Sequence, residues 1–201
     1  MNEAITTEQK ILNAASEVFQ EKGLYGARMQ EIADKAGINK ALLHYYYRSK
    51  EKLFETVFIA AVSFMAPKVR AIISSDEHLF DKIRRFTDEY ITFLSHHSYL
   101  PAFVINELNK NPQLIQDIFV REVGDNIKKI QAQFQQAVDN GEIKPIALEH
   151  VAINLISTSL FPIVTKPLLK TIMNQNEKQY QMFLEERKKM VAELIINSIK
   201  K

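Results

Sequence analysis

The sequence has no cysteine, and it contains only five glycines and six prolines among its 201 residues. Without cysteine the chain has no disulfide bonds, no thiol catalysis and no zinc site built on thiolates, and it fits a reducing compartment. The few glycines and prolines stand between segments whose apolar residues recur at helical spacing, and the alternation typical of strands is scarce. The sequence therefore predicts an all-α protein.

Long hydrophobic runs and a large excess of one charge are also missing. No stretch reaches the roughly 18 uncharged apolar residues of a membrane-spanning helix, so we expect no membrane association. The first ten residues, MNEAITTEQK, lack the basic region and apolar run of a secretory signal. The formal net charge is +2, so only local clustering of charge bears on nucleic-acid binding. We expect a cytoplasmic protein.

The first predicted helix spans residues 8–22, where the apolar residues form one stripe. Thr6 is placed to cap its N-terminus, and Gln9, three residues later, completes the pattern of a capping box. Gly23 is expected to end the helix, because glycine readily adopts the left-handed conformation found just after a helix.

Two short helices are predicted next, over residues 29–36 and 40–46. Gly37 closes the first of them, and Asn39 is a suitable N-cap for the second. Such a pair is too small to bury much core by itself, but it is well shaped to present its second helix to a DNA groove.

Longer helices are predicted for the rest of the chain. Pro67 should kink or stop the helix that begins near residue 50, and Pro162 and Pro167 should interrupt the one that begins near residue 147. The other predicted helices span 79–96, a short segment from Pro101, 112–140 and 177–199. We divide the chain into an N-terminal domain, residues 1–49, and a larger helical domain, residues 50–201.

The helix predicted for residues 40–46 has two different sides. Leu43 and Tyr47 are four residues apart and should pack inward on the two preceding helices. The opposite side is basic, polar and small, with Lys40, Ala41, His44 and Tyr45. A helix-turn-helix has this arrangement when its second helix enters the major groove of DNA.

Positive charge gathers around this helix. From Arg28 to Lys50 there are five Lys or Arg residues and two acids, a local excess of three positive charges. Asn39 and Lys40 are suited to base edges, and Ala41 is small enough to touch a thymine methyl group. Phosphate contacts, which fix position without reading sequence, suit Tyr45, Tyr46 and Lys50.

Two runs in this region, ILNAASEVFQEKGLYGARM (Ile11–Met29) and IADKAGINKALLHYYYRSKEKLF (Ile32–Phe54), resemble the N-terminal signature of the tetracycline-repressor (TetR) family of transcriptional regulators. The resemblance covers about fifty residues. It implies a homodimer that binds a double-stranded DNA operator through an N-terminal helix-turn-helix domain. It also implies a C-terminal helical domain that dimerises and binds a small-molecule effector, which releases the DNA.

The resemblance also assigns roles to residues. The positions that approach bases in the family match Asn39, Lys40, Ala41 and His44, and a helix-two position that sometimes does so matches Gln30. The phosphate-contact positions match Arg28, Tyr45, Tyr46 and Lys50. Three residues depart from the commonest family pattern: Arg28 replaces Thr or Ser, Ala41 replaces Gly and Leu42 replaces Thr.

The C-terminal domain offers candidates for an effector pocket and for a dimer interface. A cavity between helices would be lined by some of the aromatic residues Phe86, Tyr90, Phe93, Phe103, Phe119 and Phe134. The polar residues that could orient a ligand there are Asn106, Asn154, Ser157 and Thr158. The family resemblance places a four-helix dimer interface on the last two long helices, at Val151, Leu155, Leu160, Ile163, Met190, Val191, Leu194 and Ile195.

Other readings of the chain stay open. The alternative function for the helix-turn-helix is to bind a protein partner or to act as an architectural module, and steep salt dependence of DNA binding would distinguish DNA recognition from both. An enzyme is disfavoured, because the sequence has no Gly-rich phosphate loop, no G-x-S-x-G and no H-E-x-x-H motif. We expect no metal site and no cofactor. The charge run from Glu185 to Lys189 is interpreted as a solvated helix face.

Overall fold

The computed structural model describes residues 6–110 and 112–201, apart from the side chains at positions 103, 106, 107, 110, 114, 115, 118, 119, 122, 123 and 125. The described residues form ten α-helices, which confirms the all-α prediction. They are α1 (Thr7–Gly26), α2 (Met29–Ala36), α3 (Lys40–Tyr46), α4 (Lys50–Ser74), α5 (Leu79–His96), α6 (Leu100–Lys110), α7 (Pro112–Asp139), α8 (Leu148–Val164), α9 (Lys166–Ile172) and α10 (Glu177–Ile199).

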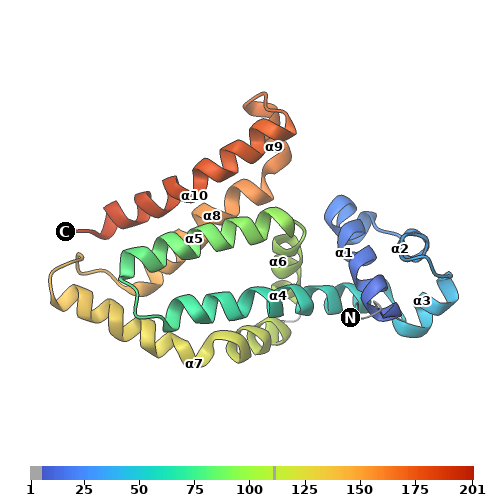
Figure 1. Cartoon of the computed structure of the whole chain (residues 1–201), viewed down its shortest axis with the longest axis horizontal. Helices are drawn as coiled ribbons and strands as arrows, with labels where there is room; N and C mark the ends of the chain where they lie inside the picture. The colour runs from blue at the N-terminus through green and yellow to red at the C-terminus, as the bar shows by residue number, and fades with distance from the viewer. Residues whose placement is uncertain (1–5, 111) are drawn as a thin grey trace, which may run out of the picture.

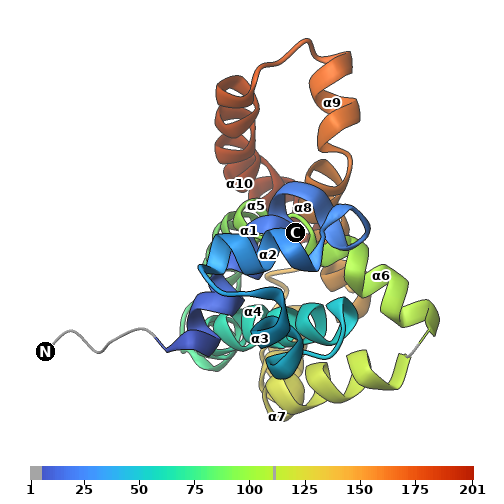
Figure 2. The same ribbon diagram turned by 90° about the vertical axis from the view of Figure 1, so that its right-hand side faces the viewer.

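The helices form a small head and a larger body (Figure 1). Helices α1, α2 and α3 make the head at one end of the molecule, and α4 runs from the head into the body. In the body α4 packs along α7, while α5 packs on α10 and α8. Helix α9 and the adjoining end of α10 project from the body (Figures 1 and 2).

Local capping explains where the head helices begin. The side-chain oxygen of Thr6 accepts a hydrogen bond from the Gln9 backbone N–H, which confirms the predicted N-cap of α1. Asn39 does the same for α3, accepting from the Leu42 N–H at 2.7 Å. The other half of the predicted capping box is not formed, because the Gln9 side chain donates to the Asn13 side chain at 2.9 Å instead of to the cap.

Two glycines make the turns of the head. Gly23 has a φ of 66° and interrupts α1, which then continues for one more turn to Gly26. Gly37 has a φ of 70° and ends α2 in the left-handed conformation that favours glycine. The bounds predicted for α2 and α3 are confirmed, because each lies between a strong start signal and a strong stop signal.

The head core continues into the body. Ile11, Phe19, Ile32 and Leu43 are fully buried, and the same cluster includes Leu53, Phe54, Val57 and Phe58 of α4 and Tyr99 and Leu100 beyond α5. The rings of Phe19 and Phe54 meet edge to face, with 4.5 Å between their centroids. The apolar core of the head thus extends past residue 49, and burial of these side chains holds the head against the start of α4.

We predicted that Pro67 would kink or stop α4, and the predicted stop is wrong. Helix α4 continues through Pro67 to Ser74. Pro67 and Ser63, the residue whose carbonyl loses its helical partner, both lie on the exposed side, where water can bond that carbonyl. Buried Met65, Ala66 and Ile72 hold the helix to the core on either side of the proline.

The predicted interruption at Pro162 is also wrong. Helix α8 runs through Pro162 to Val164, and the chain breaks at Thr165, so that Pro167 falls in the first turn of α9. Because Pro162 has no N–H, the carbonyl of Thr158 loses its helical partner. A guanidinium nitrogen of Arg187 donates to that carbonyl at 3.0 Å and replaces the missing hydrogen bond.

Helix α4 is the one described helix that is long and apolar enough to cross a bilayer, with a mean hydropathy of 1.6 over its best window. The bent pair α8 and α9 passes the same test only when taken together. Because α4 packs on α1, α5 and α7, we interpret it as the core helix that links head and body.

Candidate nucleic-acid interface

Helix α3 presents a polar face on an apolar anchor. Leu43 is fully buried and Tyr47 is 8% exposed, as the spacing of the sequence predicts. The hydroxyl of Tyr47 donates to Glu8 at 3.3 Å, and burial together with the Glu8 charge raises the pKa of Tyr47 to about 12. These contacts fix the rotation of α3 about its axis, and therefore which residues it turns outward.

The remaining residues of α3 are exposed. With about 100° between successive residues, Ala41 and Tyr45 point directly away from the core. Lys40 and His44 lie on one flank, and Leu42 and Tyr46 lie on the other. Tyr45 is 81% exposed and Tyr46 is 42% exposed, with the Tyr46 ring stacked on Tyr47. The outward surface thus has Ala41 and Tyr45 at its centre, Lys40 and His44 on one flank, and Leu42 and Tyr46 on the other.

Two predicted base-contacting residues already make hydrogen bonds within the head. The side-chain oxygen of Asn39 caps α3, so only its amide N–H groups are left for a base. The amide nitrogen of Gln30 donates to Asp34 at 2.8 Å on the exposed side of α2. Both side chains are exposed, but each would have to share or exchange a bond to contact DNA.

The predicted phosphate contacts lie around α3. Arg28 stands at the N-cap of α2 with an exposed side chain and no capping hydrogen bond. The Lys50 ammonium group donates to the carbonyl of Ala27 at 3.1 Å, so Lys50 joins the start of α4 to the turn before α2. Lys50 therefore positions the head as well as adding charge, and two of its three N–H donors are left for a phosphate.

Arg48 was not singled out from the sequence, although it belongs to the same surface. It is exposed in the turn between α3 and α4. The signal that identifies it is the absence of any Asp or Glu from Lys35 to Lys50, a stretch that also includes Lys40. A cation in that stretch adds to the local positive potential, which attracts phosphates.

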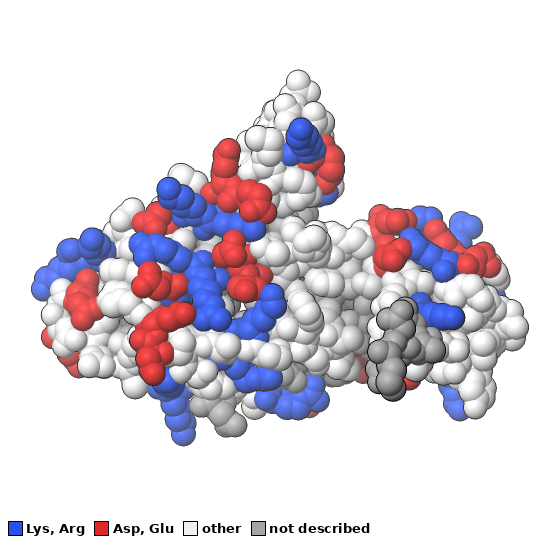
Figure 3. All heavy atoms as spheres, viewed as in Figure 1, with Lys and Arg blue, Asp and Glu red and all other residues white. Residues whose placement is uncertain are grey.

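Charges on the α1 and α2 side of the head are largely paired. Lys22 forms an ion pair with Glu31, and Lys35 forms one with Glu17 at 2.7 Å. Figure 3 shows acidic and basic side chains mixed over this side of the head. The pairing cancels charge there, so the unpaired positive charge of the head is concentrated around α3.

The head is joined to the body by hydrogen bonds as well as by α4. The amide of Gln20 in α1 donates to the carbonyl of Ser95 at 3.4 Å and accepts from the N–H of Ser98 at 3.1 Å. The hydroxyls of Ser16 and Tyr99 lie 3.3 Å apart. A movement of the corner between α5 and α6 would therefore act directly on α1.

The predicted effector-pocket residues are dispersed through the body. Phe134 is buried in the core of the body, Phe86 stacks on Tyr90 at 5.3 Å, and Phe93 packs between two core clusters. The side chains of Phe103, Asn106 and Phe119 lie outside the described residues. Asn154 is exposed, and its backbone carbonyl accepts hydrogen bonds from Ser157 and Thr158.

Ser157 and Thr158 line a hollow of about 480 Å³ formed by α8, α9 and α10. The other residues that line it are Phe161, Pro162, Leu169, Phe183 and Arg187. We name it the α8–α10 hollow. Its wall is mostly apolar, with a few polar groups, which is the composition of small-molecule sites.

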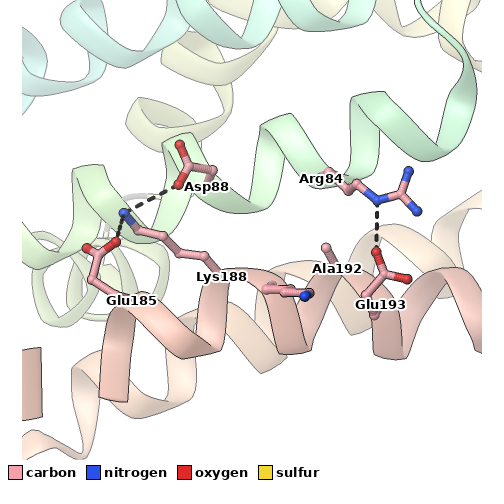
Figure 4. A pocket seen from close by; sticks show the side chains of 7 residues that line it. Arg84, Asp88, Glu185, Lys188, Ala192 and Glu193 are labelled. Atoms are coloured by element: carbon pink, nitrogen blue, oxygen red, sulfur yellow. Dashed lines mark hydrogen bonds and ion pairs between the residues drawn. The ribbon is translucent and has the colours of Figure 1, made fainter. Parts of the chain in front are cut away.

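A second hollow, of about 330 Å³, lies between α5 and α10 and is charged. Lys188 reaches from α10 to Asp88 at 3.3 Å and Glu185 at 2.7 Å, and Arg84 meets Glu193 at 2.8 Å (Figure 4). The interpretation of residues 185–189 as one solvated face is therefore wrong, because the Lys188 side chain is only 15% exposed. Pairing across two helices is not visible in the spacing of a single helix.

The predicted dimer-interface residues differ in their burial. Five of them are buried within the chain's own core: Val151, Leu155, Ile163, Val191 and Ile195. Leu160 is half-buried against that core, and Met190 and Leu194 are exposed. The exposed apolar surface on the outer side of α8 and α10 consists of Ile153, Ile156, Phe161, Val164, Met190 and Leu194, and we name it the outer apolar face.

The head of the molecule matches a known family of proteins. A family model described as "Bacterial regulatory proteins, tetR family" matches residues 11–57, which span α1 to the first part of α4. The protein named "Probable HTH-type transcriptional regulator YttP" of Bacillus subtilis is 23% identical over 193 residues, covering 92% of this chain and 91% of that protein. The similarity to YttP thus includes the body.

A second relative and a solved structure are also named as transcriptional regulators. The "HTH-type transcriptional activator FasR" of Mycolicibacterium smegmatis is 33% identical over 112 residues, covering 55% of this chain and 51% of FasR. The crystal structure of a transcriptional regulator of the TetR/AcrR family from Thermobifida fusca has a TM-score of 0.64 and 16% identity, over 92% of this chain and 96% of that chain. At this identity the structural likeness shows the fold alone.

Proposed function

The chain belongs to the tetR family of bacterial regulatory proteins and is a DNA-binding regulator of transcription, and from that premise we propose that it is a homodimeric repressor released from its operator by a small molecule. The observation that carries the proposal is the exposed face of α3 on its buried Leu43 anchor. We propose no catalytic role. A regulator acts where the chromosome is, so we place the protein in the cytoplasm.

Helix α3 would enter the major groove with its outward face. We assign base contacts to Gln30, Asn39, Lys40, Ala41 and His44. Ala41 lies at the centre of the face and lets the helix approach closely, while Lys40 is long enough to reach guanine acceptors from the flank. Arg28, Tyr45, Tyr46, Arg48 and Lys50 would hold phosphates on either side and set the register of the helix.

Dimerisation would pair two heads on one operator. The outer apolar face of α8 and α10 supports this, because exposed apolar residues that form a contiguous face mark interaction sites. A two-fold dimer buries the same face on both subunits and places two copies of α3 in successive major grooves, about 34 Å apart. Of the predicted interface residues, Met190 and Leu194 belong to that face.

An effector bound in the body would change the spacing of the heads. The bonds of Gln20 to Ser95 and Ser98 give a route, because they tie α1 to the end of α5. A ligand that binds better to the form with the wrong head spacing lowers DNA affinity by its differential affinity for the two forms. Coupling of this kind is typically about 1–3 kcal/mol.

Repression is proposed over activation because blocking a promoter requires only occupancy of the site. The relative FasR is named an activator, so the direction of regulation needs its own test. Transcription in vitro from a promoter that contains the operator tests the direction of regulation. Added protein should lower the yield of transcript, and a rise would make the chain an activator.

DNA binding itself is tested with the DNA upstream of the chain's own gene. The full chain is titrated onto that duplex and onto an unrelated duplex at several salt concentrations. We expect tight, salt-sensitive binding that prefers the upstream DNA, with two subunits per site. Equal, weak binding to every duplex tried, including a random-sequence pool, would reject the proposal and favour a protein partner for the helix-turn-helix.

A further inference from the structure

One cation in the body lacks the partner that its burial calls for. Arg187 of α10 is half-buried, and in the described part of the chain no carboxylate forms an ion pair with it. Its neighbour Lys188 shows the contrast, since it is paired with both Asp88 and Glu185. Removing a charge from water without a counterion costs free energy, so half-buried cations are normally paired.

The hydrogen bonds of Arg187 are also incomplete. One of its five N–H groups donates to the Thr158 carbonyl, which Pro162 has left without a helical partner. The Nε atom is buried and has no hydrogen-bond partner among the described residues. Burial lowers the pKa of Arg187, with no opposing effect from an acid. The hydrogen bond to Thr158 thus uses one N–H donor of the guanidinium and leaves other donors for an anion.

The surroundings of this guanidinium suit an apolar group. Arg187 lines the α8–α10 hollow together with Phe161, Leu169 and Phe183. The volume of about 480 Å³ lies within the range of roughly 300–1,000 Å³ that is usual for small-molecule sites. A cation without a counterion beside an aromatic and aliphatic wall is complementary to a molecule with an anionic head and an apolar tail.

We propose that the α8–α10 hollow binds an amphipathic carboxylate, with the carboxylate on the free donors of Arg187 and the tail against Leu169 and Phe183. Ser157 and Thr158 at the rim supply the remaining polar contacts. The assignment of this molecule as the effector rests on the proposed function, whereas the binding site does not. Bidentate contact between a guanidinium and a carboxylate is the strongest hydrogen-bonded pair these residues can make.

A carboxylate side chain of a second copy of this chain would supply the same head group. The free molecule fits the hollow better, because an acidic side chain reaching Arg187 would leave the apolar wall beside Phe183 and Leu169 largely unfilled. A void next to apolar side chains forfeits contact energy, whereas an aliphatic tail fills it. The two sources are separated by the oligomeric state of an Arg187 variant.

The test uses the full chain and the probe dodecanoate, below its micelle concentration, in isothermal titration calorimetry. Dodecanol and dodecyltrimethylammonium have the same tail without the negative charge. We expect saturable binding of dodecanoate at one site per subunit and at least tenfold weaker binding of the other two. Binding of dodecanol as tight as that of dodecanoate, or no binding of dodecanoate, would overturn the proposal.

Three variants locate the site. Arg187→Gln should weaken dodecanoate binding by about ten- to hundredfold, the usual value of a charge-assisted hydrogen bond. Lys189→Gln is the matched control: it removes one positive charge from the same helix, at the charged hollow between α5 and α10, and should leave affinity unchanged. Ser157→Phe fills the hollow from its exposed rim and keeps Arg187, so it should block binding even if Arg187→Gln fails to fold.

The remaining outcomes are decisive as well. If Arg187→Gln turns the dimer into a monomer, the anion belongs to the second copy and the proposal is wrong. Unchanged dodecanoate affinity in both Arg187→Gln and Ser157→Phe would move the site elsewhere. Operator binding without ligand is measured on the same samples, so a failure of dodecanoate binding with DNA binding intact rejects this inference and leaves the proposed function standing.

Discussion

Helices α3 and α10 use their apolar residues in different ways. In α3 a single inward position, Leu43, is fully buried, and the exposed side is basic, small and aromatic. In α10 apolar residues lie on two sides, with Val191 and Ile195 buried and Met190 and Leu194 exposed. The first pattern leaves a surface for a charged partner, and the second leaves one for an apolar partner.

The two ends of the chain therefore present surfaces of different chemistry. The head concentrates its positive charge around α3, while the charges of α5 and α10 are balanced in pairs such as Arg84 with Glu193. Arg187 of α10 differs from these pairs, because it is half-buried and no carboxylate among the described residues forms an ion pair with it. Single substitutions in α3 and α10 can test each of these differences.

The largest effect is expected at the outer apolar face. Leu194→Asp places a charge where the proposed dimer buries an apolar side chain on both subunits. Burying an unpaired charge costs about 3–5 kcal/mol, so the dimer dissociation constant should rise by about a thousandfold or more. Sedimentation equilibrium measures it.

The matched control is Lys189→Gln on the same helix, which should leave the dimer intact. Leu194 is 55% exposed in the single chain, so the folded subunit should survive its substitution. A Leu194→Asp variant that remains dimeric would show that the outer apolar face is not the interface.

The anchor of α3 should have the next largest effect. Leu43→Ala removes a fully buried side chain and leaves a cavity, which should lower the free energy of unfolding by about 2–5 kcal/mol. Leu42→Ala, at an exposed neighbouring position, should change it by no more than about 0.5 kcal/mol. Denaturant unfolding followed by circular dichroism compares the two, and equal values would mean that the rotation of α3 is wrong.

A smaller effect distinguishes base reading from phosphate binding. Lys40→Ala or His44→Ala should reduce discrimination between operator and altered sequences by about 1–3 kcal/mol. Arg48→Ala should weaken binding to every duplex to a similar degree and reduce its salt dependence. Competition binding with single-base operator variants measures both. If Lys40 and His44 behave as Arg48 does, they are phosphate contacts.

The smallest effect is a pH dependence at the corner between head and body. The His97 ring lies tilted against the Phe93 ring, with 4.7 Å between centroids, and burial, with the charge of His96 second, lowers the pKa of His97 below 6.5. The unfolded chain takes up the proton first, so this contribution to stability is present above pH 6.5 and is lost as the pH falls below that value. His97→Gln should flatten the decline in unfolding free energy on that acidic side, and an unaltered decline would exclude His97 as its source.

The head could be predicted closely from the sequence because its signals are local. Thr6, Gly37 and Asn39 act on residues within a turn or two of themselves, and Leu43 needs only helical spacing to be placed inward. The bounds of α10 were predictable for the same reason, since Asn176 and Gln179 form a capping box.

The body could not be predicted as well, because its outcomes depend on other helices. Pro162 does not end α8, since Arg187 of α10 replaces the hydrogen bond that the proline removes. Helices α8 and α10 each have apolar residues on two sides, and the sequence alone does not distinguish the buried side from the exposed one. Which side is buried, as at Leu155, and which is exposed, as at Ile156, is decided by where α5 packs.

The central claim is that two copies of α3, held by one dimer, read DNA. Selection of bound sequences from a randomised duplex pool by the full chain tests it most directly. The account predicts enrichment of an inverted repeat whose half-sites are about one helical turn apart, roughly 10–10.5 base pairs centre to centre. Enrichment of a single unrepeated site, or no enrichment at all, would contradict it.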